Sequence, residues 1–147
     1  KVYTSKKKIL EKDIDIFFNW IAPIDWKIKE YPYDKWIDLE KKISNKYNKI
    51  VWQNKNDKLD KYINKIIRSK LVISIVGLGN HISTFYSVPT IILSGPTFYE
   101  EATLHKNTKI IFPRNPCKFN TCNINKDLNH CGRMEHILIE DIINCLN

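Results

Sequence analysis

Apolar residues in this chain occur in short runs separated by polar, lysine-rich segments. Residues 71–76, LVISIV, form a mainly apolar run rich in β-branched side chains, and residues 88–93, VPTIIL, form a second one. Runs of this kind are typical of strands that are buried on both faces of a sheet. Weaker versions of the same pattern predict strands at residues 13–22, 49–52 and 109–112.

Between the predicted strands, apolar residues recur with the period of an α-helix. One helix is predicted to begin at Asp34, a second to follow Asp57 as its capping residue, and a third to span residues 139–146. Residues 26–32 are predicted to be a loop, and residues 98–104 a short acidic helical turn. The apolar faces of the three helices comprise Trp36, Leu39, Ile43 and Tyr47; Leu59, Tyr62, Ile63, Ile66 and Ile67; and Ile139, Ile142, Ile143 and Leu146.

The alternation of strands and helices predicts the α/β class, with a mainly parallel sheet of about five strands in a Rossmann-like three-layer domain. We expect residues 13–147 to form this single domain and residues 1–12 to be a linker or tail from an upstream segment. Met134 is the sole methionine, so we also expect that residue 1 is not the natural start. No apolar run is long enough for a membrane span, and no signal peptide is recognisable at the start of the sequence.

The formal net charge of +8 lies in the first half of the chain. Residues 1–70 contain 18 Lys and Arg against 10 Asp and Glu, whereas residues 71–147 contain 6 against 6. A basic segment favours a polyanionic or phosphorylated partner. The excess is lysine, however, whereas proteins that recognise a nucleic-acid sequence depend mainly on arginine. We therefore consider a basic nucleic-acid-binding module the least favoured of three functional hypotheses.

Two glycines directly follow the predicted strand at residues 71–76. Gly77 and Gly79 are followed by Asn80 and His81, and then by a segment that could form a short helix. Glycines let the backbone approach an anion, and a helix that begins there offers free N–H groups to it. The same pair is also compatible with an ordinary strand-to-helix turn. Because Ile82 replaces the third glycine, the dinucleotide-binding fingerprint is absent.

Three stretches together resemble the C-terminal, donor-binding half of glycosyltransferase family 9, the heptosyltransferase-like group with the GT-B fold. Lys29-Glu30-Tyr31-Pro32, with Trp36 four residues on, is similar to the family's K-x-W-P loop. Residues 76–90, VGLGNHISTFYSVPT, align without gaps on D-[ST]-G-L-S-H-L-A-A-A-L-G-x-P-T. Residues 93–97, LSGPT, are similar to the family's L-[FY]-G-P-T.

The resemblance implies a site for a nucleoside-diphosphate sugar, ADP-heptose being the best-known donor of the group. Lys29 would contact the phosphates, and His81 would donate to the phosphate or the sugar. Asp25 lies where the family often has hydroxyl residues that touch phosphate. The residues implied at the donor are Lys29, Gly77, Gly79, Asn80, His81, Gly95, Pro96, Thr97 and Asp25. The transfer itself would require no metal, because cations and helix N-termini can stabilise the diphosphate.

The sequence departs from the family pattern at Val76, where the family has an aspartate that would hydrogen-bond the donor. The family's general base also belongs to the N-terminal half of the enzyme, so we expect no catalytic residue in this chain and an N-terminal GT-B domain, or a partner chain, to complete the cleft. A degenerate, non-catalytic GT-B half that acts in binding or assembly is therefore the alternative hypothesis. The resemblance implies a cytoplasmic location, with a peripheral position on the inner face of a membrane as a variant.

Four cysteines in the last third of the chain suggest a structural metal. Cys117, Cys122, Cys131 and Cys145 could bind zinc or iron, with His130 or His136 as an alternative fourth ligand. Their spacing differs from the common CxxC pattern, and Cys145 lies in an apolar helical segment where a small buried residue is equally expected. A disulfide is disfavoured in the cytosol.

Overall fold

The computed structural model describes residues 11–95, 106–114 and 134–147. Its centre is a sheet of five parallel strands in the order β2-β1-β3-β4-β5. The predicted α/β class and parallel sheet are therefore confirmed. The strands are β1 (Ile14–Asn19), β2 (Ile50–Trp52), β3 (Ser69–Ile75), β4 (Thr90–Leu93) and β5 (Thr108–Ile111).

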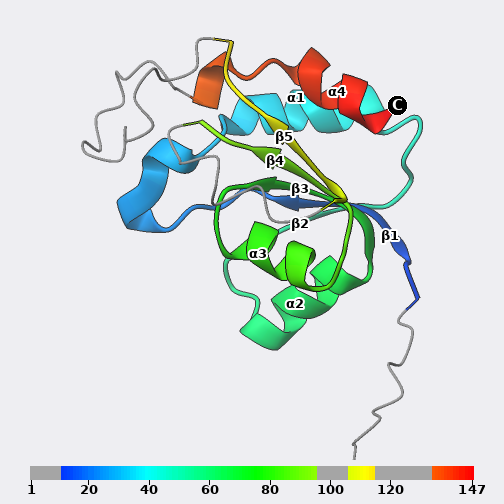
Figure 1. Ribbon diagram of the computed structural model, residues 1–147. Helices are drawn as coiled ribbons and strands as arrows, with labels where there is room; N and C mark the ends of the chain where they lie inside the picture. The colour runs from blue at the N-terminus through cyan, green and yellow to red at the C-terminus, as the bar shows by residue number, and fades with distance from the viewer. Residues whose placement is uncertain (1–10, 96–105, 115–133) are drawn as a thin grey trace, which may run out of the picture.

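Helices cover both faces of the sheet, which gives the three layers of a Rossmann-like domain (Figure 1). Helices α1 (Tyr33–Ile43) and α4 (Ile139–Leu146) contact each other on one face. Helices α2 (Leu59–Ile67) and α3 (Leu78–Phe85) contact each other on the opposite face. Two 3₁₀ helices, η1 (Ile24–Lys29) and η4 (Met134–His136), complete the described elements. The predicted loop at residues 26–32 is therefore in part the helix η1.

Side chains that alternate along the strands divide the core into two parts. Ile16 and Phe18 of β1 face α1 and α4, where the fully buried Trp36 packs 4.9 Å from the Phe18 ring. Phe17 faces α2 and packs on Tyr62 in an edge-to-face pair. This alternation follows from the two-residue period of a strand, and it explains why β1 is apolar on both sides.

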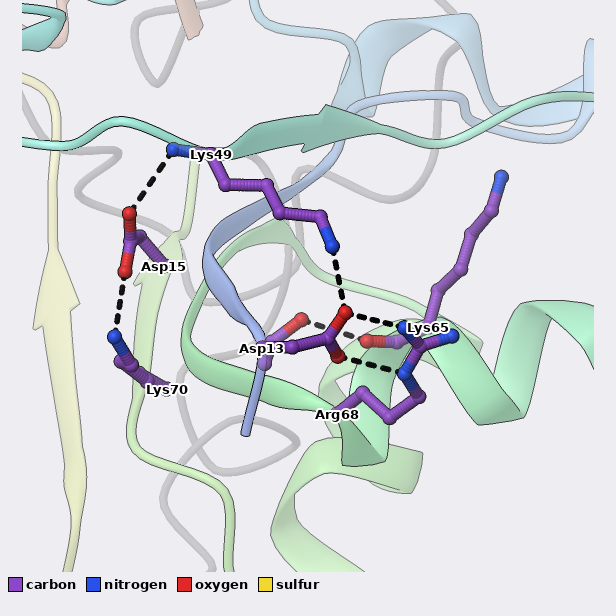
Figure 2. A network of polar contacts seen from close by, with 7 residues as sticks. Asp13, Asp15, Lys49, Lys65, Arg68 and Lys70 are labelled. Carbon is purple, nitrogen blue, oxygen red and sulfur yellow. Dashed lines mark hydrogen bonds and ion pairs between the residues drawn. The ribbon is translucent and has the colours of Figure 1, made fainter. Parts of the chain in front are cut away.

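Ion pairs connect the starts of β1, β2 and β3 (Figure 2). Asp13, just before β1, pairs with Arg68 and, at 2.6 Å, with Lys49. Asp15 pairs with Lys70 at 2.7 Å and accepts the Lys49 N–H at 2.9 Å. Hydrogen bonds from Arg68 and Lys49 hold the pKa of Asp13 below its usual range, and Lys70 does the same for Asp15.

Asp57 does not cap α2, contrary to the prediction. The N-cap residue is Lys58, which makes no side-chain capping bond. Asp57 instead pairs with Lys65 and, at 2.9 Å, with Lys61, and these two bonds lower the pKa of its carboxyl. The carboxylate therefore neutralises lysines of the first and second turns of α2.

Candidate functional site: a cavity at the carboxyl edge of the sheet

A cavity of about 560 Å³ opens where β1 and β3 end. In the observed strand order, β1 is followed by a strand on one side, β2, and then by a strand on its other side, β3. The loops after β1 and β3 therefore diverge, and ligands of open α/β sheets bind in the crevice that such a reversal creates. The volume lies within the range of small-molecule sites.

The helix η1 forms one wall of the cavity and contributes Lys29. Ile28 is buried and anchors this helix to the domain, while the neighbouring Trp26 and Lys29 line the cavity. The Lys29 ammonium lies 4.6 Å from the centre of the Trp26 ring, which is a cation–π distance. Lys29 is thus partly oriented by an aromatic side chain.

The turn between β3 and α3 forms the opposite wall. Gly77, Leu78 and Gly79 line the cavity, so the first turn of α3 borders it. The N–H groups of a first turn have no partner within the helix, and the helix dipole adds a partial positive charge there. The Asn80 side-chain oxygen accepts the Gly77 N–H at 2.6 Å and so fixes the turn.

The two glycines have different physical roles. Gly77 has an extended backbone that any residue can adopt, and a Cβ there would meet nothing within 4 Å. At Gly79 a Cβ would overlap the side-chain amide of Asn19 and would lie 2.6 Å from the Tyr62 hydroxyl. Gly79 is therefore required by close packing against β1 and α2.

A chain of buried polar groups lies beneath Gly79. The Tyr62 hydroxyl donates to Asn19 Oδ1 at 2.5 Å, and Asn19 Nδ2 donates to Ser74 Oγ at 2.7 Å. Asn19 and Ser74 are register partners in β1 and β3, which explains why their side chains meet. Asn19 and Tyr62 also line the cavity.

The third wall comes from the segment that follows β2. Gln53, Asn54 and Lys55 line the cavity there, together with Leu59 at the start of α2. The carboxylate of Asp57 also borders the cavity, but Lys61 and Lys65 neutralise it. Within the described part of the chain, no carboxylate lies within ion-pair distance of Lys29 or Lys55. The cavity therefore offers two cations and one helix N-terminus to a ligand.

Several predicted residues lie outside this cavity or outside the described residues. Asp25 and His81 are exposed and do not line it, although His81 belongs to the first turn of α3. Gly95 follows β4, half-buried. Pro96 and Thr97 are not among the described residues.

Of the four cysteines predicted as metal ligands, only Cys145 is among the described residues. Cys117, Cys122 and Cys131 fall outside the described residues, so their arrangement stays a prediction. Cys145 lies in α4 as a half-buried free thiol. In the ranges that the structure covers, no group of three or more His, Cys, Asp or Glu side chains could hold a metal ion.

The cavity residues that sequence reasoning missed include Asn19, Tyr62, Gln53 and Lys55. Asn19 was hidden within a longer predicted strand, and Tyr62 was correctly placed on the buried face of a helix without a role for its hydroxyl. A polar side chain at the end of an apolar strand would have been a usable signal for Asn19, because strand ends form the ligand edge of a parallel sheet.

The fold and the cavity define a class of protein. The chain is a Rossmann-like α/β domain whose five-stranded parallel sheet matches one half of a GT-B fold. Among the described residues, no helix is long and apolar enough to cross a membrane.

Comparison with solved structures names a particular neighbour. The chain is similar to E. coli heptosyltransferase WaaC, solved with ADP, with a TM-score of 0.62 and 12% sequence identity. The alignment covers 95% of this chain and 44% of that one, so the chain spans less than half the length of the neighbour. No family model and no curated protein matches the sequence. The likeness therefore supports the predicted GT-B-like fold.

Proposed function

We propose that this chain is the nucleotide-sugar-binding half of a GT-B glycosyltransferase. The observation that carries the proposal is the cavity at the strand-order reversal, which joins the N-terminus of α3 to Lys29 and Lys55. An anionic diphosphate would be stabilised by the cations and by the free N–H groups of the helix. The sugar, heptose-like by the family resemblance, would pass to an acceptor hydroxyl.

In this proposal the chain supplies the donor site and another domain supplies the chemistry. Lys29 and the first turn of α3 would stabilise the diphosphate as it departs, without a metal. The general base would come from an N-terminal GT-B domain or a partner chain that faces the cavity. The acceptor is left open as a glycan or a protein. A cytoplasmic location and a zinc or iron site at the cysteines accompany the proposal as predictions.

A second candidate is a GT-B half that has lost donor binding and serves in assembly. Val76 favours it, because this apolar side chain borders the cavity where the family pattern has an aspartate. Valine cannot hydrogen-bond a donor. This candidate predicts that nucleotides leave the stability of the domain unchanged.

Thermal melting with ADP, UDP or GDP tests the proposal. A ligand that binds only the folded state stabilises it by about 2.7 kcal/mol at a hundredfold excess over Kd. We expect one nucleotide to raise the melting midpoint, and Lys29→Ala to weaken its binding about tenfold, as expected for one charge-assisted contact. Lys27→Ala is the matched control, because Lys27 is exposed on the same short helix and does not line the cavity.

Two results would contradict the proposal. If none of the three nucleotides raises the midpoint, the assembly candidate replaces it. If Lys27→Ala weakens binding as much as Lys29→Ala does, the cavity is not where the nucleotide binds.

A further inference from the structure

We infer that Tyr62 and Asn19 are positioning residues, which hold the first turn of α3 at the cavity through Gly79. The inference rests on the proposed function, because it concerns how the same cavity binds its ligand. It assigns roles to two side chains that line the cavity beneath Gly79.

The hydrogen bonds beneath Gly79 run in one direction. Ser74 Oγ donates to the carbonyl of Ile75 at 2.6 Å, so toward Asn19 it can only accept. Asn19 therefore turns its Nδ2 to Ser74 and its Oδ1 to Tyr62, which must donate. Each of these hydrogen-bonded groups has a single compatible orientation, which fixes the Asn19 amide.

Burial raises the free-energy cost of disturbing this orientation of the Asn19 amide. Asn19 is 3% exposed, Ser74 is fully buried and Tyr62 is 8% exposed. Burial also raises the pKa of the Tyr62 hydroxyl, so it remains a donor throughout the neutral pH range. Its proton is used by Asn19, and Tyr62 therefore acts through Asn19 rather than by donating to a ligand.

Gly79 is the residue through which the Asn19 amide and the Tyr62 hydroxyl contact the first turn of α3. The start of α3 lies directly on the Asn19 amide and the Tyr62 hydroxyl, with no side chain between. The family pattern that this segment resembles has leucine at the position of Gly79. The close packing of α3 on a polar chain is thus a feature of this sequence.

The position of this turn matters because binding by helix N–H groups depends on geometry. Supporting contacts must hold binding groups to within about 0.5 Å of the productive arrangement. If the Tyr62 hydroxyl is removed, Asn19 loses its donor and its amide can rotate. The first turn of α3 then loses the surface on which it packs.

The experiment compares two tyrosine-to-phenylalanine variants with ADP as the probe. Tyr62→Phe retains the ring that packs on Phe17. Tyr31→Phe is the control, because the Tyr31 hydroxyl is also buried and donates to the Ile137 carbonyl at 3.1 Å, outside the cavity lining. We expect Tyr62→Phe to weaken ADP binding about tenfold, the equivalent of one buried hydrogen bond left unsatisfied. Tyr31→Phe should lower the melting midpoint without weakening ADP binding.

Amide hydrogen exchange supplies a reading that needs no ligand. Tyr62→Phe should speed exchange at residues 78–81 of the free protein, and Tyr31→Phe should not. A double-mutant cycle tests the role of Gly79. Gly79→Ala should weaken ADP binding in the wild-type background and add little in a background that carries both Asn19→Ala and Tyr62→Phe, where all the atoms that its Cβ would overlap are gone.

The outcomes distinguish this inference from the proposed function. Equal ADP affinities and equal exchange in the two tyrosine variants would overturn the inference and leave the proposed function intact. If the wild type binds none of ADP, UDP and GDP, the proposed function fails. Amide exchange at α3 then decides alone whether Tyr62 and Asn19 position the turn.

Discussion

The amino and carboxyl edges of the sheet differ in how their charged side chains are paired. At the amino edge, every carboxylate described above has a cationic partner: Asp13 has Arg68 and Lys49, and Asp15 has Lys70 (Figure 2). At the carboxyl edge, Lys29 and Lys55 border a cavity, and the nearby carboxylate of Asp57 is already neutralised by lysines of α2. The charged residues named at both edges belong to the same basic half of the chain.

The comparison shows that basic residues have two different roles within one domain. Ion pairs at the amino edge link the starts of β1, β2 and β3, so their charges contribute to the fold. Cations at the carboxyl edge lie beside a helix N-terminus with no carboxylate partner among the described residues, so a ligand must supply the opposite charge. The difference predicts which substitutions change stability and which change binding.

The largest expected effect comes from reversing the charge of the cavity. The double variant Lys29→Glu/Lys55→Glu should weaken nucleotide binding at least about a hundredfold, because two attractive contacts become repulsive. Its melting midpoint without ligand should stay close to that of the wild type, since neither lysine has an ion pair to lose in the described part of the chain. Calorimetric titration and thermal melting measure the two effects.

The control for this variant is Lys27→Glu/Lys41→Glu, which changes the net charge equally at two exposed sites outside the cavity. It should leave nucleotide affinity within a few-fold of wild type. Equal losses in both double variants would mean that overall charge, rather than the cavity, attracts the nucleotide.

The amino edge should determine how stability depends on pH. Asp13 and Asp15 have pKa values below the ordinary value of an aspartate, through Arg68 and Lys70 respectively. A lowered folded-state pKa means that the unfolded chain binds protons first as the pH falls. The stabilisation is therefore complete above about pH 4, near the unfolded pKa, and is lost as the pH decreases through the folded values.

Asp13→Asn tests this assignment. We expect a lower melting midpoint at pH 7, because Arg68 and Lys49 lose their partner, and a shallower loss of stability below pH 4. Nucleotide affinity at pH 7 should not change. The control is Asp25→Asn, since Asp25 is exposed and has no ion pair among the described residues. Identical acid profiles for Asp13→Asn and the wild type would show that these pairs do not stabilise the fold.

The sequence predicted some features of the fold more accurately than others. Apolar periodicity predicted the bounds of α4 correctly and gave most of the buried faces of α1 and α2, because those features depend on local spacing. Two members of the predicted faces differ: Tyr47 lies beyond the end of α1, and Leu59 is exposed where it borders the cavity. Strand limits were less accurate. The predicted first strand extended to residue 22, whereas β1 ends at Asn19, because the apolar residues after it continue into the cavity wall.

The cavity was predictable only in part for a physical reason. Lys29, Gly77 and Gly79 belong to local motifs, and all three line the cavity. The bonds of Asn19 with Tyr62 and Ser74 join residues 43 and 55 positions apart. Such pairs depend on strand register and helix placement, which no single segment specifies.

Salt should produce the smallest effect and should separate the two edges once more. The screening length falls from about 10 Å at 0.1 M to about 3 Å at 1 M ionic strength, and partly buried pairs are screened less than exposed charges. The carboxylate side chains of Asp57, Asp15 and Asp13 are 2%, 20% and 28% exposed. Raising sodium chloride over this range should therefore weaken nucleotide binding a few-fold and change the melting midpoint of the free domain little.

The charge-reversed cavity variant provides the decisive comparison for this measurement. Attraction at the cavity is lost in Lys29→Glu/Lys55→Glu, so its residual nucleotide binding should not weaken further with salt and should strengthen slightly as repulsion is screened. The control Lys27→Glu/Lys41→Glu should keep the wild-type salt dependence. If salt weakens nucleotide binding equally in all three proteins, the lysines that border the cavity do not carry the electrostatic attraction, and the distinction between the two edges of the sheet fails.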